Sequence, residues 1–278
     1  MGYTYNGFNM RKLDSCYHSH TTRCGHAYGT DEQYVQRAIQ HGFKVIGFSD
    51  HIFFPGVHQP GMRGDFSLLE DYKQSVLSLQ EKYRKDITVH LGFEAEYYPE
   101  FDAYYRSLFT DHGFDYLILG HHFRYENGRF PIYYAAAKNA SFIEEYANGI
   151  VAALKTGYFS YVAHPDLYML GYVGGWDVHA IQVAHTICKI AKETNTPLEL
   201  NLGGVNGRGL MHIAGEYRFP YPYDGFWAIA KQYDVQVIIG IDAHAPEQYA
   251  ANNWQILYDI VDRYQLTLID RLTFKKPR

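Results

Sequence analysis

Short apolar runs alternate with amphipathic helical segments along nearly the whole chain, and this alternation limits the fold more than any other feature. The strand-like runs cover residues 16–20, 44–49, 88–93, 116–120, 161–163, 198–202 and 235–241. Segments with helical spacing cover residues 30–42, 66–83, 141–156, 178–194, 223–233 and 248–264. Strands that alternate with helices build parallel sheets. We therefore predict an α/β fold in which seven or so βα units close into one barrel.

The length and composition fit a single barrel domain over residues 1–278. Barrels of roughly 200 to 250 residues routinely form one domain, and no proline-rich or serine-rich linker divides this chain of 278 residues. A composition of 47% hydrophobic and 20% charged residues excludes an intrinsically disordered chain. Three longer loops, at 53–64, 124–138 and 203–223, follow predicted strands. We expect them at the C-terminal face, where barrels carry their active sites.

Charge and apolar patterning limit the partners of the chain. The net charge is −5 without a basic block, so we expect no nucleic-acid partner. The longest apolar stretch, Val235–Ile241, is far shorter than the roughly 20 residues that span a bilayer, so we expect no membrane association. The three cysteines match no zinc-ribbon spacing, and residues 1–12 lack the apolar region of a signal peptide. We expect a reduced, cytoplasmic protein, and we find no signal for an oligomeric state.

Residue types that bind metals gather at the ends of six strand-like runs. They are His18, His20 and His26 after the first run, Asp50 and His51 after the second, Glu94 and Glu96 after the third, His121 and His122 after the fourth, His164 and Asp166 after the fifth, and Asp242 and His244 after the last. The carboxyl ends of parallel strands meet on one face of a barrel. Imidazole and carboxylate together suit zinc, manganese or iron better than magnesium or calcium. The pattern predicts a transition-metal site, beside which we expect Cys16 and Cys24 to be packing residues.

Six motifs, in order, resemble those of the polymerase-and-histidinol-phosphatase (PHP) superfamily of metal-dependent phosphoesterases. They are His18-Ser19-His20 with Gly25-His26-Ala27, Phe48-Ser49-Asp50-His51, Gly92-Phe93-Glu94-Ala95, His122-Phe123, His164-Pro165-Asp166-Leu167 and Asp242-Ala243-His244. The resemblance covers about residues 14–250. It is greatest to the stand-alone histidinol-phosphatases, through Met62-Arg63 and residues 69–72, 198–201 and 240–247. It implies the PHP fold, a distorted TIM-like (β/α)7 barrel, with a trinuclear centre of zinc, manganese or iron at its rim.

Carried over residue by residue, the resemblance implies nine ligands in three groups. The first group is His18, His20, Glu94 and Asp242; Glu94 bridges to a second ion held by His122 and His164; the third group is His26, His51 and His244. His121 and His122 are adjacent on an extended segment and face opposite ways, so only one of them enters the cluster. We choose His122 because it precedes a phenylalanine, as in the family.

The family chemistry also suggests residues for proton transfer. Divalent ions of such a centre activate a water and neutralise charge on the phosphate in the transition state. The leaving alkoxide needs a proton, and Asp166, two residues after His164, is our candidate donor. We expect Asp50 to support Asp166 indirectly, as a partner of one of the histidine ligands. Asp166 can equally be a helix N-cap.

The chain departs from the family where phosphate-binding arginines are expected. The family's Gly-Leu-Arg turn after the sixth strand is replaced by a longer, glycine-rich segment at 202–208, and Tyr168-Met169-Leu170 stands where the family has arginines. We therefore place the phosphate contacts at Arg63 and Arg208. Arg124 is a further basic candidate that we interpret as a surface charge.

The resemblance implies a phosphoric monoester hydrolase, a histidinol-phosphatase that converts L-histidinol phosphate to L-histidinol and phosphate in histidine biosynthesis. A second hypothesis keeps the enzyme and changes the substrate to a nucleotide or phosphotyrosine, because the segment at 203–208 differs from the family. A third is a non-catalytic, metal-stabilised module, which the complete ligand set and the absence of an additional domain disfavour. In each case we expect two or three divalent transition-metal ions.

Overall fold

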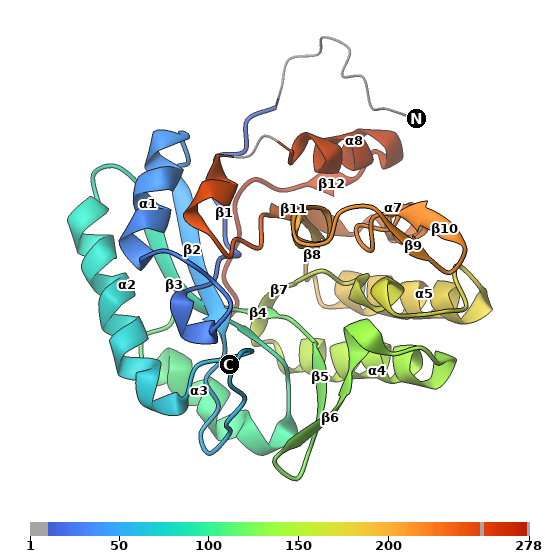
Figure 1. Ribbon diagram of the computed structural model, residues 1–278, viewed down its shortest axis with the longest axis horizontal. Coiled ribbons are helices and arrows are strands. Elements are labelled where there is room, and N and C mark those ends of the chain that lie inside the picture. The colour runs from blue at the N-terminus through green and yellow to red at the C-terminus, as the bar shows by residue number, and fades with distance from the viewer. Residues whose placement is uncertain (1–10, 251–252, 277–278) are drawn as a thin grey trace.

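The computed structural model describes residues 11–250 and 253–276, and its main feature is an eight-stranded sheet curled around a central axis (Figure 1). In order across the sheet the strands are β1 (Ser15–Cys16), β2 (Val45–His51), β3 (Thr88–Ala95), β4 (Tyr116–Leu119), β7 (Phe159–Val162), β8 (Leu198–Asn201), β11 (Gln236–Gly240) and β12 (Thr267–Leu268). Every neighbouring pair is parallel. All seven predicted strands are present, which confirms the predicted TIM-like α/β barrel. The two-residue strand β12 is an addition.

Helices connect successive strands along the outside of the sheet (Figure 1). They are α1 (Asp31–Gln40), α2 (Leu69–Tyr83), α3 (Asp102–Thr110), α4 (Ala140–Thr156), α5 (Val178–Glu193), the single turn α6 (Gly203–Asn206), α7 (Asp224–Tyr233) and α8 (Gln255–Tyr264). The start of α1 shows why the sequence gives a helix there, because Thr30 and Gln33 form a reciprocal capping box. Helix α3 was not predicted from the sequence.

The two edges of the sheet meet at the C-terminal ends of β1 and β11. Ser19 and Ala243 form a parallel bridge, in which the His20 amide donates to the Ala243 carbonyl at 2.8 Å and the Ala243 amide donates to the His18 carbonyl at 3.1 Å. At the opposite end β12 lies beside β11. Closure at Ser19 therefore brings the first metal-binding motif next to the last one, although more than 200 residues separate them.

The inside of the barrel is divided into an apolar layer and a polar layer. At the N-terminal end, the inward-facing side chains form one apolar cluster, which is Tyr17, Val45, Tyr116, Ile118, Tyr161, Ala163 and Ile238. Tyr116 fills this layer, and its hydroxyl donates to the Tyr17 carbonyl at 2.7 Å. Polar side chains occupy the other end of the interior. The barrel is thus a packed core with chemistry at one face.

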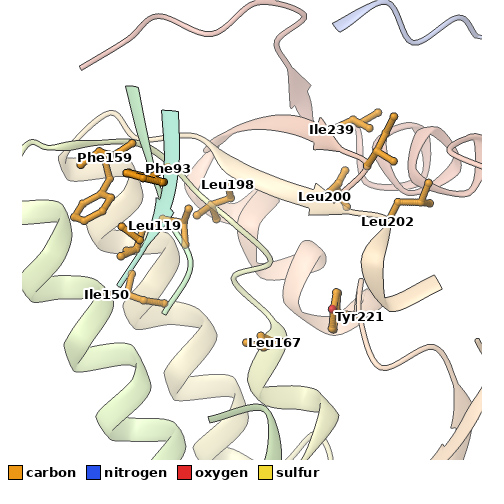
Figure 2. Packing of buried hydrophobic residues seen from close by; sticks show 14 of the residues in the cluster. Phe93, Leu119, Ile150, Phe159, Leu167, Leu198, Leu200, Leu202, Tyr221 and Ile239 are labelled. Atoms are coloured by element: carbon orange, nitrogen blue, oxygen red, sulfur yellow. The ribbon is translucent and has the colours of Figure 1, made fainter. Parts of the chain in front are cut away.

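A larger apolar cluster packs the outer face of the sheet against the helices. Figure 2 shows Phe93, Leu119 and Phe159, from β3, β4 and β7, gathered near Ile150 of α4. Alternate residues of each strand face inward, so a strand such as β4, buried on both faces, reads as the continuous apolar run YLIL.

Two of the three predicted loops contain hairpins. The 124–138 segment carries β5 (Phe123–Glu126) and β6 (Arg129–Tyr133), joined by an Asn127-Gly128 turn in which both residues have positive φ, the preferred chemistry of a two-residue hairpin loop. The 203–223 segment carries β9 (Met211–Ile213) and β10 (Glu216–Arg218), which also pair antiparallel.

The structure does not describe residues 1–10, so most of the stretch that we predicted to lack a signal peptide lies outside the described residues. Residues 251–252, within the predicted helix 248–264, also lie outside them. Across the described ranges, no helix combines the length and apolar character needed to cross a membrane.

The close approach of Tyr116 to the backbone gives a stability prediction. A Cβ added at Gly92 would lie 2.5 Å from Tyr116 Cε1, so Gly92→Ala forces the ring to move within a packed interior. We expect a loss of about 1–3 kcal/mol in the free energy of unfolding, measured by urea denaturation. In a Tyr116→Leu background the same change should cost less, and an equal cost in both backgrounds would contradict this packing.

Candidate metal centre

His18 and His20 follow β1 and point into the polar layer of the barrel, with no exposed surface. His18 Nε2 and His20 Nε2 lie 3.4 and 3.1 Å from Asp242 Oδ1, and each lies 3.5 Å from Glu94 Oε2. Glu94 comes from β3 and Asp242 follows β11. The structure therefore brings the four residues of the first predicted group together.

The second oxygen of Glu94 faces the second predicted group. Glu94 Oε1 lies 2.8 Å from His164 Nε2 and 3.3 Å from His122 Nε2, and these two imidazole nitrogens are 3.3 Å apart. The carboxylate is 1% exposed. Each oxygen of the carboxylate thus faces a different group of imidazole nitrogens, as expected of a ligand that bridges two ions.

The third predicted group lies at the solvent side of the same cluster. His26 Nε2 and His244 Nε2 are 3.0 Å apart, and the ligand atoms of His26, His51 and His244 lie within 4.8 Å of one another. His51 Nδ1 is also 3.1 Å from Glu94 Oε2, which joins this group to the first. His51 is buried, whereas the side chain of His244 is 27% exposed. Access from solvent therefore lies on the side of His26 and His244.

Unpartnered polar atoms test whether this cluster fits a metal. Among the described residues, buried side-chain atoms of the cluster without a hydrogen bond are His18 Nε2, His20 Nδ1 and Nε2, His51 Nδ1, Glu94 Oε2 and His164 Nδ1. A buried polar group without a partner is costly, and an ion is one of the few ways to satisfy it. Imidazole nitrogens and carboxylate oxygens suit zinc, manganese or iron. The residues present fit such ions.

Acceptors behind the rings orient most of the histidines. Glu199 Oε1 lies 2.9 Å from His18 Nδ1, and Glu96 Oε1 lies 3.3 Å from His122 Nδ1. Backbone carbonyls of Cys24 and Asp242 serve the same purpose for His26 and His244. Asp50 Oδ1 lies 3.6 Å from His20 Nδ1, which is beyond hydrogen-bond distance. An acceptor at Nδ1 favours the tautomer with its proton there, which leaves Nε2 free to bind an ion.

Glu199 and Glu96 have roles that the sequence reasoning missed. Glu199 is fully buried on β8, where it also accepts from the Asn201 side chain at 2.7 Å and from the His164 amide at 3.1 Å. The signal was available, because Glu199 and Asn201 are the polar residues of the buried strand LELN and alternate with its outward-facing leucines.

The carboxylates also determine which imidazoles are basic. Burial alone would lower the pKa of His20 and of His122, but neighbouring carboxylates outweigh it and raise each pKa to about 9. Burial lowers the pKa of His244 to about 3, and the charge on His20 adds to that effect. Because ligands must be deprotonated, metal binding displaces protons from the basic imidazoles.

His121 lies outside the cluster. Its ring stacks on Tyr134 with centroids 4.9 Å apart, and a Cβ added at Gly149 of α4 would lie 2.1 Å from its Nε2. Burial lowers the pKa of His121 to about 4. The structure therefore turns His122, and not His121, toward Glu94.

The three arginines considered from the sequence occupy different environments. Arg63 is buried and paired with Glu96, with 2.8 Å between Nη2 and Oε1. Arg124 is partly buried and lies 3.4 Å from Glu145. Arg208 is exposed and lies beside Tyr133.

Arg208 affects the pKa of Tyr133. Burial of the phenol raises its pKa, the Arg208 guanidinium lowers it, and the charges of Glu94 and Asp242 raise it. Tyr133 belongs to β6 and Arg208 follows α6. The two rim segments therefore approach each other at these side chains.

Asp166, two residues after His164, is buried. Its Oδ2 accepts from the Tyr223 amide at 2.6 Å and from Trp227 Nε1 at 3.2 Å, contacts that hold the start of α7. Its Oδ1 has no hydrogen-bond partner among the described residues, and burial raises the pKa of the carboxyl to about 6. Asp166 occupies the N-cap position of a short 3₁₀ helix, but its side chain makes no capping bond there.

Comparison with known proteins agrees with this fold and site. The family model described as the PHP domain matches residues 17–202, so the chain belongs to the PHP domain family, whose members are metal-dependent. A probable histidinol-phosphatase of Deinococcus radiodurans is 24% identical over 237 residues, which is 82% of this chain and 85% of that protein. The histidinol-phosphatase of Bacillus subtilis is 32% identical over 123 residues, 41% of this chain and 45% of that protein.

A solved structure shares the fold. The histidinol phosphate phosphatase of Lactococcus lactis, crystallised with zinc, L-histidinol and phosphate, superposes with a TM-score of 0.68 at 16% identity, covering 94% of this chain and 99% of that one.

The contact between Glu199 and His18 gives a prediction for metal binding. Glu199→Gln keeps the shape of the side chain but removes the charge that orients His18, so zinc affinity should fall by about 10- to 100-fold. The measurement is a zinc titration in competition with a chelator. Glu193→Gln, an exposed change on α5, is the control and should leave the affinity unchanged. Parent-like zinc affinity in Glu199→Gln would remove Glu199 from the centre.

Proposed function

We propose that this protein is a metal-dependent histidinol-phosphatase, which hydrolyses L-histidinol phosphate to L-histidinol and phosphate in histidine biosynthesis. The observation that carries the proposal is Glu94, buried between two clusters of imidazole nitrogens at the C-terminal rim of a PHP barrel. Relatives that cover most of the chain bear the name histidinol-phosphatase. The substrate is a small phosphate ester, and no domain beyond the single barrel is required.

The nine clustered residues would hold two or three divalent ions of zinc, manganese or iron. They are His18, His20, His26, His51, Glu94, His122, His164, Asp242 and His244. Such ions, when bound, bind phosphate oxygens, neutralise charge in the transition state and activate a water for attack on phosphorus. Glu94, which faces both groups of imidazoles, would hold such ions between them, and the carboxylates of Glu199 and Glu96 orient the rings of His18 and His122.

Asp166 remains our candidate to protonate the leaving alkoxide. A carboxyl with a pKa of about 6 is partly protonated near neutral pH, and a general acid works best when its pKa lies near the working pH. The contacts of Oδ2 with Tyr223 and Trp227 hold the carboxyl in place, while Oδ1 is free to carry the proton. Asp50, whose Oδ1 lies 3.6 Å from His20 Nδ1, would act through that histidine and not on the substrate.

Arg208 is our candidate for the phosphate contact from the protein. It is exposed on a rim segment beside Tyr133. A guanidinium can bind two phosphate oxygens at once, which gives orientation as well as affinity. Arg63, the other arginine predicted for this role, is already paired with Glu96.

A reducing, cytoplasmic location also belongs to this proposal. Cys16, Cys24 and Cys188 are all free and buried, which suits a compartment that keeps thiols reduced.

A panel of phosphate esters tests the substrate. We expect kcat/KM for L-histidinol phosphate to exceed that for a nucleoside monophosphate and for phosphotyrosine by at least about 10-fold, because only the first offers the amine and imidazole that the site should recognise. The measurement is steady-state phosphate release with zinc or manganese supplied. A higher kcat/KM for one of the other esters would reassign the substrate, and hydrolysis of none would favour the non-catalytic module.

The phosphate contact is tested by Arg208→Ala. Loss of one charge-assisted contact of about 1.5–3 kcal/mol should raise KM and lower kcat/KM for histidinol phosphate by about 10- to 100-fold, with the metal content unchanged. Arg129→Ala, an exposed change in the β5–β6 hairpin, is the matched control. Equal kcat/KM in Arg208→Ala and parent would remove Arg208 from the substrate site.

A further inference from the structure

Arg63 and Glu96 form a buried ion pair beside the metal cluster. Arg63 Nη1 donates to Glu96 Oε2 at 3.0 Å, Nη2 donates to Oε1 at 2.8 Å, and the two side chains are 0% and 1% exposed. Nε donates to Gln59 Oε1 at 2.7 Å, and Nη1 also donates to the Ile52 carbonyl at 3.1 Å. Each guanidinium nitrogen of Arg63 therefore has a partner within the protein, and the side chain is turned away from solvent.

The carboxylate of this pair continues to a metal ligand. Glu96 Oε1 lies 3.3 Å from His122 Nδ1, and the opposite nitrogen of the same ring, Nε2, lies 3.3 Å from both Glu94 Oε1 and His164 Nε2. The result is a continuous series of contacts from Arg63 through Glu96 and His122 to the bridging carboxylate. A carboxylate at Nδ1 holds the ring in one tautomer and one orientation.

Two rim segments enclose the guanidinium. The Arg63 Cζ atom lies 5.4 Å from the ring centre of Phe54, in the segment after β2, and 5.4 Å from that of Phe130 on β6. Aromatic faces attract a guanidinium and exclude water from it. The guanidinium therefore contacts aromatic rings from two segments at the rim of the barrel.

We propose that Arg63 and Glu96 are a positioning pair that orients His122 and so sets the affinity of the second metal position, and that Arg63 does not bind the phosphate of the substrate. The inference rests on the proposed metal centre but not on the identity of the phosphate ester. Without Arg63, the Glu96 carboxylate loses the two parallel contacts that hold it in place, so it no longer fixes the His122 ring. Without the charge on Glu96, the same ring loses its acceptor.

The test measures zinc affinity and steady-state kinetics in Arg63→Met, Glu96→Gln and the double variant. We expect each single change to weaken the weakest-bound zinc ion by about 10- to 100-fold in a chelator competition, and to change the visible spectrum of the cobalt-loaded protein. KM for the phosphate ester should change by less than about 3-fold, because neither residue touches the substrate. The double variant should lose no more affinity than the worse single variant, since both act through His122.

Arg263→Met is the matched control, because Arg263 forms an exposed pair with Asp224 at 2.7 Å on the outer helices and should leave zinc affinity unchanged. Arg63→Lys covers the case in which Arg63→Met does not fold, since it keeps the charge but loses the two parallel contacts. It should show a smaller loss of zinc affinity.

Two results would overturn the inference. If Arg63→Met, or Arg63→Lys in its place, raises KM by 10-fold or more with parent-like zinc affinity, Arg63 binds phosphate. If both zinc affinity and KM match the parent, the pair does not position the metal. A parent protein that binds no zinc, manganese or iron would instead overturn the metal centre itself, together with this inference.

Discussion

The Glu94 carboxylate is the contact on which the rest of the site depends. One of its oxygens faces His18, His20 and His51, and the other faces His122 and His164. A buried carboxylate is costly unless positive charge surrounds it, and bound ions would satisfy this carboxylate and the imidazoles around it together. The position of Glu94 on a central strand, with neighbouring strands on both sides, makes these contacts possible.

The barrel supplies this arrangement through strand alternation and through closure. Inward-facing positions at the N-terminal end of the strands are apolar and packed around Tyr116, so the polar residues are confined to the other end. Closure at Ser19 and Ala243 then brings His18 and His20 to Asp242. The site therefore depends on closure of the barrel, because Ser19 lies between His18 and His20 and Ala243 lies between Asp242 and His244.

Much of this could be predicted from the sequence, because strand ends and ligand residue types are local features. The seven strands and the gathering of histidines at one face follow from periodicity alone. The environment of Arg63 could not be predicted in this way, because its partner Glu96 lies 33 residues away and pairing depends on how two rim segments fold together. Glu199 was missed because it contacts Nδ1 of His18, on the side of the ring away from the other ligands. A charged residue within a buried strand could nevertheless have indicated a role for it.

Elemental analysis of purified parent protein and Glu94→Gln tests the central claim most directly. A bridging carboxylate holds two ions where an imidazole holds one, so the parent should carry about two or three ions of zinc, manganese or iron per chain and the variant should lose more metal than any single histidine variant. An unchanged circular dichroism spectrum would show that the barrel remains folded. Full metal content and full rate in Glu94→Gln, or a parent without metal whose activity no added metal restores, would contradict the account.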